Sequence, residues 1–238
     1  MQQLSIFDDL LTKDAVVPAE VAQATPVAKV IQNLQPFKPV RRTQFFRMTD
    51  DVLDALTGPS SKVRANINAV ETAIHLRHTG LTATIEQRQA LAAFTGWGGL
   101  SEVFAHNSAF ASEQDRLKSI LTPEEYTQAQ DSVLTAYFTE PAVIRAMWAM
   151  VRKAGFSGGA VIEPSCGSGH FIGCMPDDMR EKSRVQMVEI DPVTAAIAGG
   201  LYSDEKTTVL NTGIEKCQHV AKFDLVIGNV PFGSYRVS

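Results

Sequence analysis

The sequence lacks long hydrophobic runs, is poor in cysteine and carries no excess of positive charge. No apolar stretch approaches the ~18 residues of a membrane-spanning helix, and Met1-Gln2-Gln3 does not begin a signal peptide, so we expect no membrane association. Three cysteines, Cys166, Cys174 and Cys217, are odd in number and lack paired zinc spacing, which indicates reduced thiols in a cytoplasmic protein without a metal site. The formal net charge of −4 argues against binding nucleic acid through bulk charge, but does not exclude a local basic groove.

What the sequence does contain falls into three segments. Its 238 residues are 45% hydrophobic and 20% charged, which predicts a packed core. Residues 1–47 are predicted to be a flexible tail or linker, because their four prolines interrupt helices and strands alike. Within this tail, Leu4–Leu11 could dock on a partner, or it could be an ordinary part of the tail. Residues 48–133 form a helical region by their pattern, and residues 134–238 form a second domain of alternating strands and helices.

The one basic run, Lys38–Arg47, contains four cations and no acid, with aromatic residues interleaved. Such a run suits a phosphate backbone with a stacked base. The interpretation that we favour is that the run leads into the folded part of the chain, with Phe45 and Phe46 packed inside.

Start and stop signals divide the helical region. Thr49 is predicted to cap a helix that Gly58-Pro59 ends, and the next apolar pattern predicts a helix ending at Gly80. Thr84 begins a capping-box pattern, and Thr122-Pro123 marks a further helix start.

Two other features of the helical region stand out. Three glycines surround a tryptophan in the segment Thr95–Leu100, which indicates a tight loop pressed against another part of the protein. His75 and His78 lie three residues apart on a predicted helix, but a third ligand is missing nearby, so surface positions are favoured over a metal site.

From Leu134 onward the pattern predicts an α/β fold with a parallel sheet. Thr139 is expected to cap a helix that begins at Glu140-Pro141, and Asp191-Pro192 is expected to open a later helix. The predicted strands are Ala160–Glu163, Arg184–Glu189, Thr207–Leu210 and Asp224–Ile227.

The loop Gly167-Ser168-Gly169 follows the first predicted strand and opens a helix. Glycines there allow a ligand to approach the backbone, and helix amides point at it. Glu189 ends the next strand, where an acid can accept both hydroxyls of a ribose. A third glycine is missing and Pro164-Ser165-Cys166 adds bulk, so the loop predicts a nucleoside without a pyrophosphate.

The segment Asn229-Val230-Pro231-Phe232 follows the fourth predicted strand. The Asn229 side chain and the Val230 carbonyl can accept hydrogen bonds from an exocyclic amine, while Phe232 can stack on the ring that carries it. A strand that ends in an ordinary turn is the alternative interpretation of the segment.

Four motifs in order resemble those of S-adenosylmethionine-dependent DNA methyltransferases, in the arrangement of the gamma class of adenine N6 enzymes. They are Tyr137–Pro141, Val161–Phe171, Glu189–Asp191 and Asn229–Phe232. The resemblance implies a Rossmann-like class I methyltransferase fold that is truncated after its fourth strand. It implies that the cofactor is bound by Phe138, Thr139, Glu163, Pro164, Cys166, Gly167, Gly169, Glu189 and Ile190. It further implies that Asn229, Val230, Pro231 and Phe232 form the catalytic tetrapeptide.

A narrower resemblance covers about residues 60 to 236, and it depends on the segment Phe94–Leu100, the helix that contains Trp148, and Asn229–Gly233. It is to the methylase end of large phage and plasmid methyltransferase–helicase proteins, some of which serve in antirestriction. The implied function is methyl transfer to adenine N6 of a base flipped out of DNA. Val230 stands where the family commonly has proline, but the expected acceptor is a backbone carbonyl, which valine also has. For the contact to the cofactor adenine, Asn211 and Glu215 are both candidates.

Three alternatives stay open on the sequence. The acceptor could be a glutamine amide in a protein, because similar tetrapeptides serve that reaction. The chain could be a non-catalytic interaction protein that keeps the cofactor fold, or a truncated relic. Since the family continues beyond the tetrapeptide, we also expect either a longer protein or a further polypeptide that completes the sheet and supplies DNA recognition.

Overall fold

The computed structural model describes residues 45–134, 138–217 and 222–230. All of these residues belong to one compact unit, Leu34–Ser238. Residues 1–44, with the Leu4–Leu11 segment and most of the basic run, lie outside the described residues.

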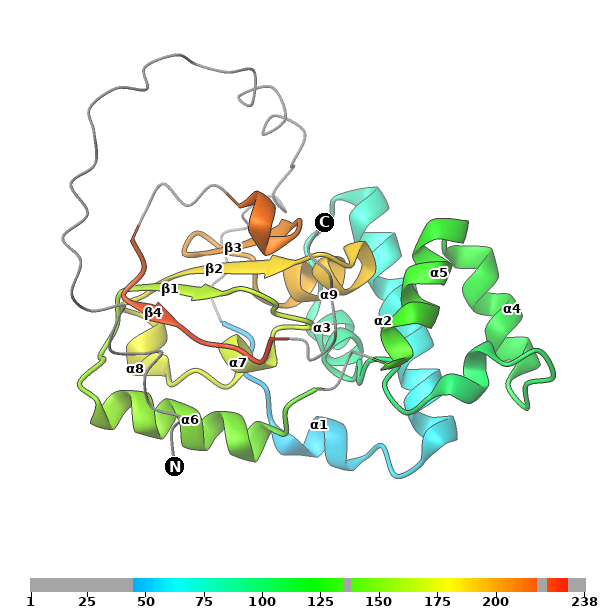
Figure 1. The fold of residues 1–238 in the computed structure, drawn as a ribbon, viewed down its shortest axis with the longest axis horizontal. Helices are drawn as coiled ribbons and strands as arrows, with labels where there is room; N and C mark the ends of the chain where they lie inside the picture. The colour runs from blue at the N-terminus through cyan, green and yellow to red at the C-terminus, as the bar shows by residue number, and fades with distance from the viewer. Residues whose placement is uncertain (1–44, 135–137, 218–221, 231–238) are drawn as a thin grey trace, which may run out of the picture. The chain divides into compact units, whose positions relative to one another are not determined.

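Four parallel strands form the sheet, in the order β3-β2-β1-β4 (Figure 1). In chain order they are β1 Ala160–Glu163, β2 Arg184–Glu189, β3 Thr207–Asn211 and β4 Leu225–Val226. This order, in which the chain steps outward from β1 and then returns to its other side, is that of Rossmann-like folds, so the α/β prediction is confirmed. The strand β4 is two residues shorter than predicted, and β3 is one residue longer.

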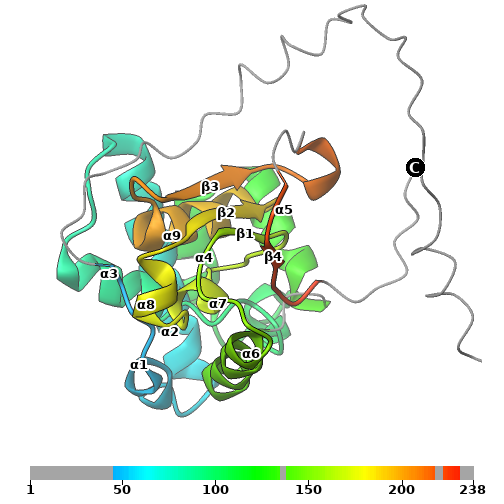
Figure 2. The same ribbon diagram turned by 90° about the vertical axis from the view of Figure 1, so that its left-hand side faces the viewer.

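One face of the sheet is covered by helices. Figure 2 shows the helices α6 to α9 on the same side of the four strands. Their bounds are α6 Pro141–Lys153, α7 His170–Gly173, α8 Asp177–Arg180 and α9 Pro192–Tyr202. Val161, Val185 and Met187 of the strands belong to the core, whereas Val226 in β4 is exposed.

The helices of the helical region form where they were predicted. The elements of this region are α1 Asp50–Asp54, α2 Pro59–Thr79, α3 Ile85–Ala92, η4 Ser101–Phe104, α4 Ala111–Ile120, α5 Pro123–Asp131 and η5 Ser132–Leu134. However, Thr49, at the cap position of α1, makes no side-chain capping bond. Gly80 ends α2 in a left-handed conformation, as its role as helix stop requires. The capping boxes begun by Thr84 and Thr122 are both formed. Gly58-Pro59 proves to be the start of α2 as well as the break after α1.

The helical region and the sheet share one hydrophobic core. The helices α2 and α3 pack against α9, so closely that a side chain at Gly200 would meet Cδ1 of Leu91 at 2.6 Å. Leu91 is completely buried at this contact. The helical segment is therefore packed directly on the helix that joins β2 to β3, while the domain boundary at residue 133 stays a prediction.

The chain enters the described region through two aromatic residues. The Phe45 and Phe46 rings lie 5.8 and 6.2 Å from the ring of buried Tyr202, measured between centroids. Arg47 forms an ion pair with Asp177 at the start of α8. The prediction that the two phenylalanines pack inside is confirmed, which leaves this part of the basic run with a structural role.

Candidate functional site

The predicted cofactor residues meet at the carboxyl ends of β1 and β2. The N–H of Cys166 donates to the carbonyl of Val188 at 2.9 Å, which fastens the loop after β1 to the end of β2. The next residue, Gly167, donates its N–H to Oε2 of Glu189 at 2.8 Å. The glycine loop and the acid that ends the next strand, predicted from their spacing in the sequence, are therefore in direct contact. This edge of the sheet is where ligands of open α/β sheets bind.

Glu189 is held from several sides. Its second oxygen, Oε1, accepts the N–H of Asp191 at 2.9 Å. The side chain of Asn211 donates from Nδ2 to the carbonyls of Glu189 and Ile190 at 2.9 and 3.0 Å. Burial raises the pKa of the Glu189 carboxyl from 4.5 to about 7. The acid is thus fixed in place, and its burial favours the protonated form more than in a free glutamate.

The residues beside Glu189 differ in exposure and role. Ile190 is 65% exposed, so its side chain is free to contact a ligand. The side-chain amide of Asn211 donates to two backbone carbonyls and so stabilises the turn after β2. Glu215 is exposed, and its carboxylate lies directly over Gly213. The choice between Asn211 and Glu215 for an adenine contact stays open.

Backbone conformation explains the two loop glycines. Gly167 and Gly169 have φ values of 54° and 86°, a left-handed region that other residues rarely adopt. A side chain at Gly169 would also meet Cε of Met187 and Cε2 of Tyr202 at 2.6 Å. The helix that follows, α7, has only one turn. The prediction of a glycine loop is confirmed, and the helix that it opens is a single turn.

Glu163, at the end of β1, is the most deeply buried acid of the site, with 1% of its surface exposed. Its Oε2 has no hydrogen-bond partner among the described residues. Burial, and next the charge of Glu189, raise the pKa of this carboxyl well above 4.5. This shift favours the protonated form of Glu163, which can donate as well as accept a hydrogen bond.

Further buried polar atoms of the predicted cofactor segments have no partners among the described residues. They are Oγ1 of Thr139, Oγ of Ser168 and both ring nitrogens of His170. Burial lowers the pKa of His170 to about 4, so its ring is neutral. The predicted helix cap at Thr139 is wrong: Glu140 occupies the cap position of α6, and Thr139 makes no capping bond. Buried polar atoms without partners are costly, and a cluster of them indicates a ligand.

Phe138 covers the loop. A side chain added at Gly167 would meet Cε1 of the Phe138 ring at 3.2 Å, and the ring centroid lies 5.0 Å from that of His170. Pro164 and Cys166 complete the loop, and burial raises the pKa of the Cys166 thiol well above 9, so the thiol is neutral. Tyr137, the first residue of this motif, lies outside the described residues.

Only the first half of the tetrapeptide lies within the described residues. Asn229 and Val230 are exposed just beyond β4, and Pro231 and Phe232 lie outside. The N–H of Ile227 donates to the carbonyl of Ile162 at 3.1 Å, which sets the register of β4 on β1. A side chain at Gly228 would contact Cγ of Glu163 at 3.4 Å. Asn229 therefore follows directly on a residue that lies beside the end of β1.

The sequence analysis did not predict Ser168, His170 and Gly228 as residues of the candidate site. The first two stand inside the quoted loop, but their types gave no signal, because burial without a partner is visible only in three dimensions. His75 and His78 are both exposed on α2. Within the described residues, no group of three or more His, Cys, Asp or Glu side chains could hold a metal ion, and no helix is long and apolar enough to cross a membrane.

Comparisons with known proteins yield similarity to solved structures only. No family model and no curated protein matches the chain. Among solved structures, it is similar to a Listeria monocytogenes protein proposed to be a class I S-adenosylmethionine-dependent methyltransferase, with 16% sequence identity and a TM-score of 0.38. The similarity covers 74% of this chain and 61% of that one, so it spans less than two thirds of the other protein.

Proposed function

We propose that this chain is an S-adenosylmethionine-dependent methyltransferase that acts on adenine N6 of a base flipped out of DNA. One observation carries the proposal: the end of β1 and the loop after it lie next to both halves of the site. Gly167 donates its N–H to Glu189 at 2.8 Å, and a side chain added at Gly228, the residue before Asn229, would meet Cγ of Glu163 at 3.4 Å. Residues suited to a nucleoside and a residue suited to an amine therefore lie at one edge of the sheet.

The residues present fit the cofactor. Glu189 accepts one N–H on each oxygen, and because a carboxylate has about four acceptor positions, both oxygens can also accept ribose hydroxyls. Ile190 offers an exposed apolar surface to the adenine ring. Phe138 and Thr139 flank the loop on the side that the methionine part would occupy. The unpartnered atoms of Glu163, Ser168 and His170 are suitable contacts for its polar groups.

The chemistry needs little beyond positioning. When bound, S-adenosylmethionine supplies a methyl group on a sulfonium sulfur, which keeps the electron pair of the broken C–S bond and leaves as a thioether. Oδ1 of Asn229 and the carbonyl of Val230 would accept the amine hydrogens and direct the lone pair that forms the new N–C bond. The displaced amine proton passes to solvent. Pro231 and Phe232 would orient this turn and stack on the base.

The partner that we propose is DNA, and the narrower resemblance to phage and plasmid proteins makes antirestriction the proposed setting. A base must leave the helical stack to reach such a pocket. The net charge of −4 requires that phosphate contacts be local, in the basic run or in a further polypeptide.

Calorimetry and methyl transfer test the proposal in two steps. Titration of the folded chain with S-adenosylmethionine should show binding, and S-adenosylhomocysteine should compete with it. Tritiated methyl groups should then appear in DNA, as N6-methyladenine after hydrolysis. Label in protein instead would favour a glutamine acceptor, and no binding by a chain with a cooperative unfolding transition would refute the proposal.

A second candidate is a non-catalytic protein that binds a further polypeptide along β4. The observation in its favour is an apolar groove of about 230 Å³ between α6 and β4. Its lining residues are Met147, Met150, Val151, Leu225, Val226, Ile227 and Gly228. Met150 and Val226 are 68% and 65% exposed there, and within the described residues β4 pairs only with β1. Turnover by the isolated chain would count against this candidate.

A further inference from the structure

The Thr95–Leu100 loop of the helical region has no part in the function proposed above, yet it reaches the same site. Gly96 has a φ of 73°, and a side chain there would overlap the Cε2 edge of the Phe138 ring. The opposite edge, Cε1, faces Gly167, where an added side chain would lie at 3.2 Å. The Phe138 ring thus lies between two glycines, one from the helical region and one from the cofactor loop.

A buried amide fixes the start of this loop. Asn66, on α2, is fully buried, with 0% of its surface exposed. Its Nδ2 donates to the carbonyl of Gly96 at 2.6 Å, and its Oδ1 accepts from the N–H and the hydroxyl of Thr95 at 2.8 and 3.1 Å. A buried amide is tolerated only when it is bonded, and here every bond goes to two consecutive loop residues. Asn66 therefore determines where the Gly96 backbone lies.

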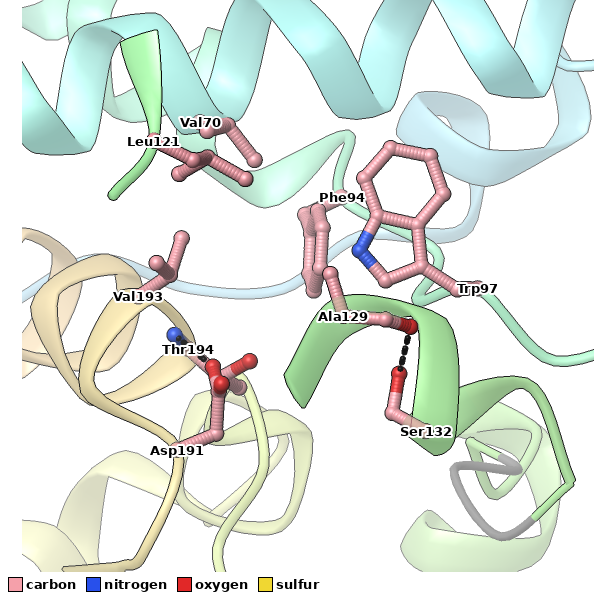
Figure 3. A pocket seen from close by; sticks show the side chains of 9 residues that line it. All are labelled: Val70, Phe94, Trp97, Leu121, Ala129, Ser132, Asp191, Val193 and Thr194. Atoms are coloured by element: carbon pink, nitrogen blue, oxygen red, sulfur yellow. Dashed lines mark hydrogen bonds between the residues drawn. The ribbon is translucent and has the colours of Figure 1, made fainter. Parts of the chain in front are cut away.

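The loop is also held from its other side. Phe94 packs edge to face on both Trp97 and Phe138, with ring centroids 6.1 and 6.0 Å apart. Figure 3 shows Trp97 and Phe94 across a small cavity from Asp191. The cavity measures about 10 Å³, close to the room of a single water, so the loop packs tightly against the turn after β2.

We propose that Gly96, in the Thr95–Leu100 loop, forms one wall of the donor site against Phe138, and that Asn66 is a positioning residue for Phe138. The contacts form a continuous path: Asn66 holds Gly96, Gly96 limits Phe138, Phe138 covers Gly167, and Gly167 donates to Glu189. The helical region, which carries none of the four motifs, thereby limits the depth of the pocket for the methionine part of the cofactor. This inference rests on the proposed function, because it names the wall of that same site.

Two glycines of the loop provide a matched test. Gly96 and Gly99 both have φ 73°, but a side chain at Gly99 would have nothing within 4 Å. Alanine at either position costs the same backbone strain, and only Gly96→Ala also displaces Phe138. We expect Gly96→Ala to weaken S-adenosylmethionine binding by roughly tenfold or more in calorimetry, and Gly99→Ala by less than about twofold.

Asn66 has its own control on the same helix. Asn68 is exposed, and its backbone, not its side chain, accepts the bond from Thr72. Asn66→Ala should raise the cofactor Kd, whereas Asn68→Ala should leave it unchanged. A Phe138→Leu background should make Gly96→Ala less harmful, because the shorter side chain leaves room for the new methyl group.

The outcomes separate the two proposals. Wild-type chain that folds but binds no S-adenosylmethionine overturns the proposed function, and this inference with it. Wild-type binding with equal affinities for Gly96→Ala and Gly99→Ala overturns the inference alone. If Asn66→Ala does not fold, the cofactor Kd values of Gly96→Ala, of Gly99→Ala and of Gly96→Ala in the Phe138→Leu background test the inference. A loss of thermal stability without a change in Kd for Gly96→Ala would assign the loop a purely structural role.

Discussion

Gly167 and Glu189 are joined by a hydrogen bond of 2.8 Å from the glycine N–H to the carboxyl Oε2. The same carboxyl accepts the N–H of Asp191 through Oε1 at 2.9 Å. One side chain therefore connects the loop after β1 with the turn after β2, and it still has acceptor positions to offer. The predictions below follow from this arrangement and from the buried groups around it.

Glu189→Gln should weaken cofactor binding. Glutamine replaces one of two acceptor oxygens by an NH₂ group, which would face a backbone N–H of Gly167 or Asp191. Hydrogen bonds to a charged acceptor contribute about 1.5–3 kcal/mol, so we expect the Kd for S-adenosylmethionine to rise by roughly tenfold to a hundredfold. Calorimetry measures this, with the exposed Glu181→Gln as control. Unchanged affinity would remove Glu189 from the binding site.

Stability should depend on pH through the same carboxyl. Its pKa is about 7 in the folded protein and 4.5 in the reference state, so the folded state binds the proton more tightly. The contribution to the free energy of unfolding is complete below pH 4.5 and is lost as pH rises to about 7. Relative to Glu189→Gln, wild type should lose on the order of 3 kcal/mol across this window.

Urea unfolding of both proteins at a series of pH values provides the comparison. The difference in free energy of unfolding between wild type and Glu189→Gln is compared at each pH. His170, whose pKa is lowered to about 4, contributes stability that rises with pH, and because both proteins contain it, this contribution cancels in the difference. A difference that is flat from pH 4.5 to 7 would show that the Glu189 carboxyl is not shifted.

His170→Phe should separate stability from binding. Both ring nitrogens of His170 are buried without a partner among the described residues, so an apolar ring removes a penalty of about 1–3 kcal/mol. We expect a free energy of unfolding that is equal to or higher than that of wild type, together with weaker cofactor binding. Thermal unfolding and calorimetry on one sample measure both. Strong destabilisation would mean that the imidazole has a partner in the folded protein.

Asn229→Ala should abolish methyl transfer and leave cofactor binding intact. Asn229 is exposed beyond β4, so its loss removes no packing. A single transition-state hydrogen-bond group typically contributes a factor of about 10²–10³ in kcat. Val230→Ala is the matched control, because the proposed acceptor at that position is the backbone carbonyl. Parallel loss of binding and transfer in Asn229→Ala would contradict the assigned role.

Local signals predicted the capping boxes and a helix stop, although the predicted cap at Thr49 forms no side-chain bond. The capping boxes at Thr84 and Thr122 and the stop at Gly80 depend on residues three or four apart, so the sequence contains all that decides them. The predicted cap at Thr139 is wrong. A threonine before a helix is an equally good local signal, but Glu140 takes the cap position of α6, and the Thr139 hydroxyl is buried without a partner among the described residues.

By itself, the sequence determined the order of strands and helices, the left-handed glycines after β1 and the acid that ends β2. Each follows from short-range geometry or from alternation along one strand. Only the tertiary structure decided which groups lose their water. Burial of Glu163 and His170, and the insertion of Phe138 between Gly96 and Gly167, join segments up to about seventy residues apart, and no local pattern encodes such contacts.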